Sequence, residues 1–406
     1  MRNGYDVVRR RIGSYQKTAG KDDANMKRRL LCGLLAVLLL PLAAVSVRAA
    51  DLAETAPSAI LIEQSTGTVL FEKNDHEKLA PASVTKVMTL LLVMEALAEG
   101  RIGWDDTVTA SEAAAAKGGS QIYLEVGEQL PLREMLKAVV VSSANDCACA
   151  LAEHVAGSEE AFVARMNERA AELGMEDTHF VNCTGLDDGE AAKEHRTSAY
   201  DIALMSRELL KHDEIREYTT IWMDSVRDGQ FGLSNTNKLV RFYQGTTGLK
   251  TGFTSGAGYC LSASAERDGI EFIAVVMACK TSDERFTAAK SLLDYGFANY
   301  ALVSPEPAEP LPPVAVRLGT VSEIQAKLAD AEPLLAGKSA AAKAERVVEL
   351  AESVEAPVEA GQKLGTVTVR AGETVLAEIP LVAEEAVARL TWWDAARLIL
   401  RRACLG

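Results

Sequence analysis

The segment Pro81–Gly100 reads PASVTKVMTLLLVMEALAEG, and the rest of the chain is organised around it. Its apolar residues recur at helical spacing, and Pro81 and Ser83 suit a helix start, so we predict a largely buried helix here. Ser83 and Lys86 would then stand one turn apart on the same face. A hydroxyl beside an amine in a dry site is what nucleophilic catalysis by a serine needs.

Taken alone, this Ser-x-x-Lys pattern has a simpler interpretation, in which Ser83 caps the helix and Lys86 is solvated. If Lys86 is instead buried, its pKa falls, and the neutral amine is available to take the hydroxyl proton. The choice between the two depends on the motifs that follow along the chain.

Residues 1–49 are predicted to be a leader outside the fold. Residues 26–49 begin with Met-Lys-Arg-Arg, continue through the apolar run Leu30–Leu42 and end in small residues, which is typical of a secretory signal peptide. The apolar run is short for a membrane-spanning helix. We therefore expect cleavage near Ala49 or Ala50, and export.

The composition indicates a globular protein with room for one to three domains, because 48% of the 406 residues are hydrophobic and 25% are charged. The net charge is −14, and −21 without residues 1–49, which makes nucleic acid a poor partner. The seven cysteines indicate no disulfide framework, and the five histidines show no metal-ligand spacing. We interpret them as packing residues and expect no metal.

The order of predicted elements indicates an α+β domain over residues 50–302. A hairpin is predicted at Ser58–Leu70, and strands at Tyr259–Ala265 and Glu271–Ala278. Helices are predicted within Pro131–His154, with a break at residues 142–146, and at Ser158–Met175, Thr197–Lys211 and Asp283–Tyr300. We expect the terminal strands to share one antiparallel sheet, with the helical middle inserted across its edge.

Beyond this domain, residues 303–313 form a proline-rich linker and residues 314–383 a small all-β domain. Thr366–Val369 and Thr374–Ile379 make a plausible hairpin within it.

Residues 386–406 are predicted to form a C-terminal amphipathic helix. Residues 389–406 read RLTWWDAARLILRRACLG, so one face carries Trp392 and aliphatic side chains and the other carries Arg397, Arg401 and Arg402. Such a helix suits the interface of a membrane. The alternative is that it docks on the protein's own β domain.

Two further motifs can supply polar groups to Ser83. Ser143-Ala144-Asn145 falls at the predicted helix break, where side chains can project into a cleft. Lys250-Thr251-Gly252 leads into a glycine-rich run. Each also has a plain interpretation, as a helix cap or a strand end. The run is not a Walker loop, because it lacks Gly-Lys-Ser/Thr in that order and a following helix.

The order and spacing of the three motifs are more specific than any one of them. Ser-x-x-Lys, then Ser-x-Asn about 60 residues on and Lys-Thr-Gly about 100 beyond, is the pattern of the penicillin-recognising serine enzymes. The stretches ASVTK, SSANDCACALAEH, TSAYDIALMSREL, LSNTNKL and GLKTGFTSGAGYCLSASA resemble the D-alanyl-D-alanine carboxypeptidases, the low-molecular-weight penicillin-binding proteins. The resemblance covers about Ala56–Tyr300 closely, and the C-terminal half in layout.

The resemblance implies catalytic roles for five residues. Ser83 attacks the carbonyl between the two terminal D-alanines and forms an acyl-enzyme, with Lys86 as the base. Ser143 and Asn145 line the opposite wall, relay protons and hold Lys86 and the substrate amide. Lys250 adds positive charge beside this network.

The resemblance also implies a substrate-binding set. Thr251 and Thr254 would face the substrate carboxylate, Gly252 completes the Lys-Thr-Gly motif, and Arg285 is similar to the family's carboxylate-binding arginine. Cationic and hydroxyl groups are the expected partners of a terminal carboxylate.

Phe253 is a departure from the family pattern, since many relatives carry histidine after Lys-Thr-Gly. The backbone N–H groups of Ser83 and Phe253 would still form the oxyanion hole. No clear glutamate-bearing loop of the β-lactamase kind is found, so deacylation of penicillin should be slow.

We therefore expect an exported serine D,D-carboxypeptidase that removes the terminal D-alanine from peptidoglycan pentapeptides and is inhibited by β-lactams. Its expected place is the outer face of a bacterial cytoplasmic membrane, with the C-terminal helix on the membrane surface, and it needs no cofactor. The alternatives are a D,D-endopeptidase acting on cross-links, a β-lactamase and a non-catalytic wall-binding scaffold.

Overall fold

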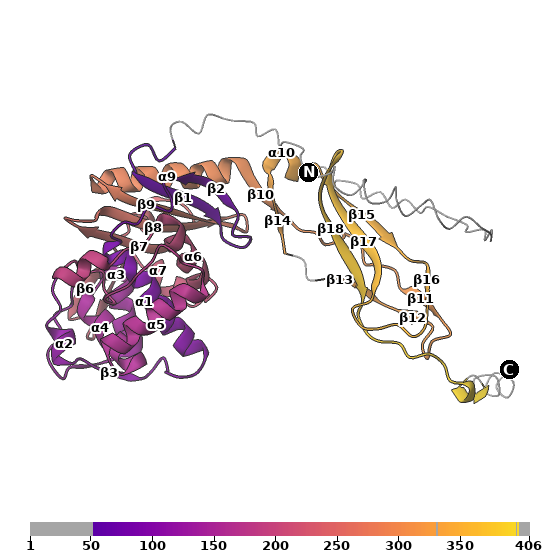
Figure 1. The fold of residues 1–406 in the computed structure, drawn as a ribbon, viewed down its shortest axis with the longest axis horizontal. Helices are drawn as coiled ribbons and strands as arrows, with labels where there is room; N and C mark the ends of the chain where they lie inside the picture. The colour runs from indigo at the N-terminus through magenta and orange to yellow at the C-terminus, as the bar shows by residue number, and fades with distance from the viewer. Residues whose placement is uncertain (1–51, 330–331, 395, 398–406) are drawn as a thin grey trace, which may run out of the picture.

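The structure is a computed structural model that describes residues 52–329, 332–394, 396 and 397 (Figure 1). The predicted leader lies outside the described residues, and so do residues 395 and 398–406 of the predicted C-terminal helix. The prediction that this helix begins at residue 386 is wrong, because Val387 and Arg389 pair with Val358 and Gly319 in β-bridges and the helical residues start at Trp392. The N-terminal part combines one main sheet with many helices, and the C-terminal part is mostly β (Figure 1). The predicted α+β fold with a following β region is confirmed.

A five-stranded antiparallel sheet organises the N-terminal part, in the order β2-β1-β9-β8-β7. The strands are β1 (Ser58–Glu63), β2 (Val69–Lys73), β7 (Thr246–Thr254), β8 (Gly258–Arg267) and β9 (Ile270–Cys279). β1 pairs with β9, so the first hairpin and the last strand share the sheet as predicted. Strand β7 was not predicted, because its glycines and threonines resemble a loop.

Helices cover both faces of this sheet (Figure 1). They are α1 (Lys86–Ala98), α2 (Glu112–Ala115), α3 (Leu132–Ser142), α4 (Asn145–Ala156), α5 (Glu159–Glu172), α6 (Ala199–Leu209), α7 (Ile215–Thr219), α8 (Leu239–Phe242) and α9 (Ser282–Asn299). The helical middle packs on one face, with α1 buried almost throughout, and α9 packs on the other. The predicted helices and the break between α3 and α4 are present.

The position of strand β9 between two cores explains why its sequence is apolar without alternation. Ile273 and Val275 face the core around α1, whereas Phe272 and Val276 face the core beneath α9. A strand buried on both faces reads as a continuous apolar run. This strand therefore joins the two cores of the N-terminal part.

Two short hairpins lie outside the main sheet. The first pairs β3 (Thr107–Thr109) with β4 (Gln129–Pro131), and the second pairs β5 (Met223–Val226) with β6 (Phe231–Ser234).

The C-terminal part begins where β10 (Tyr300–Val303) pairs with β14 (Leu334–Gly337). Its other elements are β11 (Val314–Arg317), β12 (Glu323–Ile324), β13 (Ala326–Leu328), α10 (Lys338–Ala341), β15 (Ala344–Leu350), β16 (Ser353–Glu355), β17 (Lys363–Ala371) and β18 (Thr374–Ala383). The predicted hairpin is present as β17 and β18. These strands enclose a core of their own.

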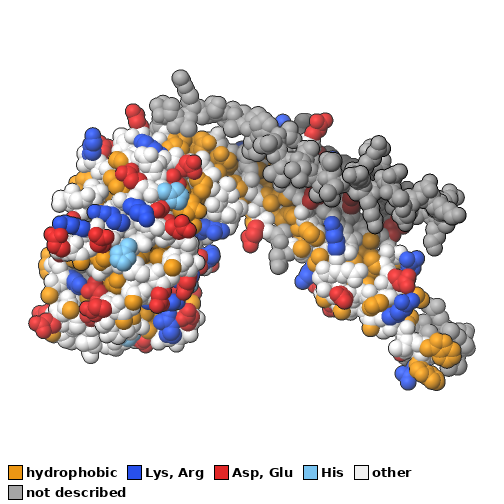
Figure 2. Space-filling view, in the orientation of Figure 1, with side chains coloured by type: hydrophobic (Ala, Val, Ile, Leu, Met, Phe, Trp, Pro, Cys, Tyr) orange, Lys and Arg blue, Asp and Glu red, His pale blue; other side chains and the backbone are white. Residues whose placement is uncertain are grey.

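Residues 392–394 are helical and stand at the far tip of the C-terminal part, where Figure 2 shows hydrophobic side chains on the surface. Trp392 is 82% exposed and Trp393 73% exposed. Among the described residues, no helix has the length and apolarity needed to cross a bilayer.

Substitution of Phe272 tests the contact between the sheet and α9. Phe272 is fully buried, its ring meets that of Phe297 edge-on at a centroid distance of 5.0 Å, and Gly296 leaves it room, since a Cβ there would lie 2.9 Å from the ring. Phe272→Ala should lower the free energy of unfolding by about 3–5 kcal/mol, because a large buried ring leaves a cavity. Urea unfolding measures this. Phe242→Ala is the control, because Phe242 is 74% exposed, and equal effects of the two changes would contradict the packing described.

Candidate active site

Ser83 lies in a 3₁₀ turn, η2 (Ala82–Thr85), that leads directly into α1. Its hydroxyl accepts a hydrogen bond from the Nζ atom of Lys86 at 2.9 Å. Lys86 is fully buried, and the cap of α1 is Thr85. The plain interpretation of this motif, a capping serine with a solvated lysine, is therefore wrong.

Burial decides the protonation of Lys86. Its Nζ atom also donates to the carbonyl oxygen of Thr184 at 2.8 Å. Loss of solvent lowers the pKa of Lys86 to about 7, although the nearby charge of Asp146 opposes the shift. A large fraction of the amine is thus neutral at physiological pH and can accept a proton from a neighbouring hydroxyl.

The second motif sits at the break between α3 and α4. Ser143 has a left-handed backbone (φ 63°), which ends α3 and lets α4 begin at Asn145. The amide of Asn145 donates to the Gly118 carbonyl at 2.7 Å, while its Oδ1 atom is buried without a hydrogen-bond partner among the described residues. An unpaired buried acceptor is costly, so Asn145 presents a ready acceptor to a bound ligand.

The third motif lies on β7, and this strand runs against the turn that carries Ser83. A Cβ on Gly252 would lie 2.6 Å from the Pro81 carbonyl oxygen and 3.1 Å from the backbone nitrogen of Ser83. The strand can approach this closely only because residue 252 is glycine. Phe253 follows with its side chain 53% exposed and its ring 4.3 Å from that of Tyr259.

Lys250 is as deeply buried as Lys86 and donates to the Thr251 carbonyl at 2.9 Å. Burial lowers its pKa well below the ordinary value, and the positive charges of Lys86 and Arg285 lower it further. The sequence-based expectation that Lys250 supplies positive charge stays a prediction, and an anionic ligand nearby would favour the charged form.

Three of the predicted substrate-binding side chains have partners within the protein. Thr251 donates its hydroxyl to that of Thr236 at 2.7 Å, and the hydroxyl of Thr254 accepts from the Ala257 N–H at 3.1 Å. Arg285 extends from the first turn of α9 and donates to the Gly252 carbonyl at 3.0 Å. Arg285 therefore holds β7 through its backbone.

The segment that holds Lys86 in place was missed by sequence analysis. The Asn182 side chain accepts the N–H of Gly185 at 2.7 Å, and the ring of His195 bonds the hydroxyl of Thr85 at 2.8 Å. These bonds fix the Thr184 carbonyl toward Lys86. Burial lowers the pKa of His195 to about 4, so its ring is neutral at physiological pH. A carbonyl leaves no sequence signal, because every residue has one.

The buried carboxylate of Asp146 was also missed. It accepts the N–H groups of Ile122 and Leu124 at 3.0 and 3.1 Å, which ties the preceding loop to the start of α4. Its position directly after Asn145 is the signal that would have found it.

The chain also resembles known proteins over most of its length. The family model for D-alanyl-D-alanine carboxypeptidase matches residues 44–281, and that for the penicillin-binding protein 5 C-terminal domain matches residues 309–389. The D-alanyl-D-alanine carboxypeptidase DacF of Bacillus subtilis is 41% identical over 380 residues, covering 89% of this chain and 94% of the relative. DacC of Escherichia coli is 34% identical over 337 residues, covering 81% and 83%.

Solved structures of penicillin-binding proteins also match this chain. Penicillin binding protein 5 from Haemophilus influenzae matches with a TM-score of 0.69 and 28% identity, over 82% of this chain and 98% of that one. A penicillin-binding protein from Listeria monocytogenes in its ampicillin-bound form matches with a TM-score of 0.55 and 32% identity, over 60% and 98%. The chain therefore belongs to the D-alanyl-D-alanine carboxypeptidases, the low-molecular-weight penicillin-binding proteins, and is a serine-type hydrolase of that family.

Proposed function

We propose that this enzyme removes the terminal D-alanine from peptidoglycan pentapeptides through an acyl-enzyme on Ser83. The observation that carries the proposal is the bond between the Ser83 hydroxyl and the fully buried amine of Lys86. A serine is a weak nucleophile at its ordinary pKa, and an adjacent neutral base activates it.

The proposed reaction has two steps. In the first, Lys86 takes the Ser83 proton, the Ser83 oxygen bonds to the carbonyl carbon between the two D-alanines, and the C–N bond breaks. We propose that Ser143 helps to return the proton to the leaving nitrogen. The N–H groups of Ser83 and Phe253 stabilise the oxyanion, which the contact between Gly252 and the Ser83 turn supports. In the second step, water hydrolyses the ester and frees Ser83.

Lys250, Thr251, Thr254 and Arg285 are proposed to recognise the terminal carboxylate of the substrate. The lowered pKa of Lys250 reflects burial beside Lys86 and Arg285 without a counter-charge. A carboxylate would supply that counter-charge and favour the protonated form of Lys250. The cationic cluster is therefore best satisfied when an anion occupies the cleft.

The proposed location is the outer face of the cytoplasmic membrane, after export directed by residues 26–49. Exposed Trp392 and Trp393 beside an arginine-rich segment support contact of residues 386–406 with a lipid surface. We further propose residues 50–302 as the catalytic domain and residues 314–383, joined through the linker at 303–313, as a spacer.

Labelling with a fluorescent penicillin tests the nucleophile. We expect one long-lived adduct per parent chain by intact mass, none on Ser83→Ala, and normal labelling of Ser322→Ala, a change at an exposed serine of the C-terminal part. Absence of an adduct on folded parent protein would contradict the proposal and favour the scaffold. An adduct lost within seconds would favour a β-lactamase. Digestion of cross-linked muropeptides would distinguish a D,D-endopeptidase from a D,D-carboxypeptidase.

The pH dependence of acylation tests the base. Since burial lowers the pKa of Lys86 to about 7, the neutral form dominates above that pH and is lost as the pH falls. The acylation rate constant should reach a plateau above about pH 8 and fall about tenfold per pH unit below about pH 6. Single-turnover labelling measures it, with circular dichroism to show that the protein remains folded. A flat profile would rule out Lys86 as the titrating base.

Gly252→Ala tests the oxyanion hole. The added methyl would lie 2.6 Å from the Pro81 carbonyl oxygen and push β7 away from Ser83. Acylation should slow about 10²–10³-fold, the effect of losing one oxyanion donor. Gly256→Ala is the matched control, because a Cβ there makes only an ordinary contact of 3.5 Å with Asp187. Equal acylation rates of the two variants would argue against this geometry.

A further inference from the structure

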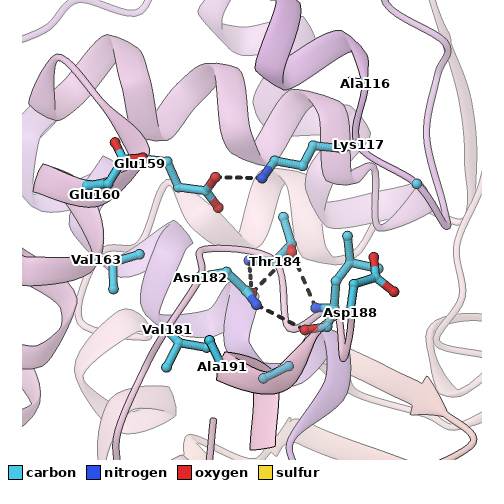
Figure 3. A pocket seen from close by; sticks show the side chains of 13 residues that line it. Ala116, Lys117, Glu159, Glu160, Val163, Val181, Asn182, Thr184, Asp188 and Ala191 are labelled. Carbon is cyan, nitrogen blue, oxygen red and sulfur yellow. Dashed lines mark hydrogen bonds and ion pairs between the residues drawn. The ribbon is translucent and has the colours of Figure 1, made fainter. Parts of the chain in front are cut away.

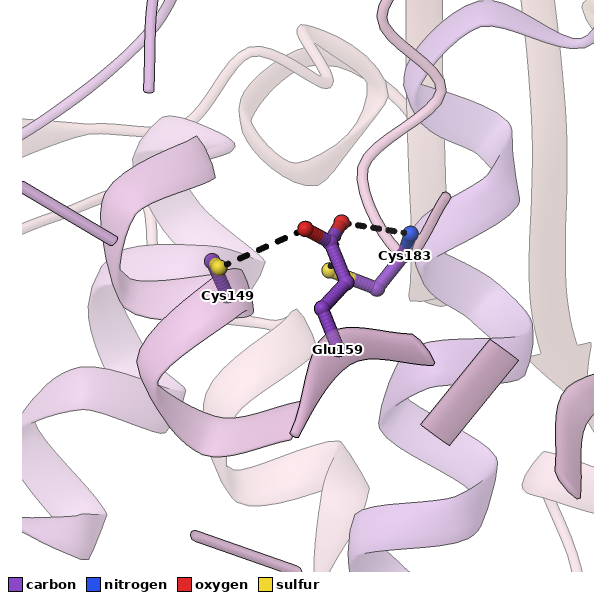
Figure 4. A group of neighbouring side chains, drawn as sticks. All are labelled: Cys149, Glu159 and Cys183. Carbon is purple, nitrogen blue, oxygen red and sulfur yellow. Dashed lines mark hydrogen bonds between the residues drawn. The ribbon is translucent and has the colours of Figure 1, made fainter. Parts of the chain in front are cut away.

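Two cysteines and a glutamate from three parts of the chain converge on one another (Figure 4). Cys149 comes from α4, Glu159 from the first turn of α5, and Cys183 from the segment that carries Thr184. The sulfur of Cys149 lies 3.7 Å from one carboxylate oxygen of Glu159, and that of Cys183 lies 3.2 Å from the other. One sulfur or oxygen from each residue lies within 4.8 Å of the other two.

We propose that Cys149, Glu159 and Cys183 bind one thiophilic divalent cation, with Zn²⁺ as the best match. Two thiolates and a carboxylate form a donor set that Zn²⁺ accepts in tetrahedral geometry, with a water as the fourth ligand. With Zn–S bonds of about 2.3 Å, neighbouring donors stand about 3.8 Å apart. The observed separations need shifts of only about 1 Å or less to reach that geometry. This proposal replaces the sequence-based interpretation of these two cysteines as packing residues.

The cluster has a route to solvent. A cavity of about 490 Å³ reaches Glu159 and is also lined by Lys117, Glu160 and Asp188 (Figure 3). Three carboxylates against one amine give this cavity a negative balance, which favours the entry of a cation. Both thiols are fully buried, whereas the Glu159 side chain is 18% exposed. An ion would therefore meet the carboxylate before the thiols.

Lys117 balances the charge of the occupied site. Its Nζ atom lies 2.5 Å from the Glu159 carboxylate. A divalent ion with two thiolates and one carboxylate carries a net charge of −1, which the ammonium of Lys117 neutralises. Binding expels the two thiol protons to solvent. One oxygen of Glu159 can hold the ion while the other keeps Lys117, an outer partner of the kind that orients metal ligands.

The cluster is joined to the catalytic groups through the backbone. Cys183 precedes Thr184, whose carbonyl accepts from Lys86, and Lys117 precedes Gly118, whose carbonyl accepts from Asn145. Drawing Cys183 toward an ion shifts the Thr184 carbonyl. Bound Zn²⁺ is therefore expected to slow acylation several-fold, a consequence that rests on the proposed function, whereas the binding itself does not.

Titration with Co²⁺ tests the site in the reduced, metal-free protein. We expect a thiolate-to-cobalt charge-transfer band that saturates at one Co²⁺ per chain and disappears when Zn²⁺ is added. Cys149→Ala and Cys183→Ala should each bind Co²⁺ at least about 100-fold more weakly. Substitution of a residue that only contacts a metal ligand already lowers metal affinity about 10–100-fold, and loss of a ligand itself should lower it at least as much. Cys147→Ala should bind normally, since Cys147 is equally buried on the same helix but lies outside the cluster.

The proposal is overturned if the parent shows no cobalt band, or if both cluster variants keep it. A Cys149–Cys183 disulfide that persists under reducing conditions, detected as two missing thiols, would overturn it as well. Zn²⁺ should raise the Tm of the parent and of Cys147→Ala but not of Cys149→Ser. The serine variant is included because it keeps a small polar side chain at residue 149 and is therefore expected to fold. A protein that binds Co²⁺ but is not acylated by penicillin would refute the proposed function and leave the metal site standing.

Discussion

The burial of one amine governs the architecture of the catalytic part. Lys86 is placed by α1 inside the protein, where an unpaired charge would be very costly. This cost is reduced because the Lys86 amine donates hydrogen bonds to the Ser83 hydroxyl and the Thr184 carbonyl, and because its lowered pKa favours the neutral form. The Asn182 and His195 contacts hold that carbonyl, and β7 closes the other side of the Ser83 turn. Each of these elements is needed because the amine is cut off from water.

A second buried lysine adds to the electrostatic cost of the site. The positive charges of Lys86 and Arg285 add to burial in lowering the pKa of Lys250. An anion beside these groups would lower the electrostatic cost of charging Lys250. Under the proposed function, binding of the substrate carboxylate would therefore favour protonation of Lys250.

The sequence predicted what depends on side-chain type and spacing. The apolar run of β9, the break at Ser143 and the buried helix after Ser83 were all visible. Strand β7 was not visible, because close approach to Ser83 requires small residues that otherwise indicate a loop. The Thr184 carbonyl and the convergence of Cys149 with Cys183 were also hidden, since they depend on backbone groups and distant contacts.

The pairing of β1 with β9 also has a consequence for how the chain matures. Residues paired between these strands, such as Ser58 and Met277, stand more than 200 positions apart in the sequence. A chain that emerges from its N-terminus must hold the first hairpin and the Ser83 turn unsupported until β7, β8 and β9 arrive. Ser83 is therefore made early, but its surroundings are completed late. A truncated chain that ends before β7 would carry Ser83 without the strand that closes its site.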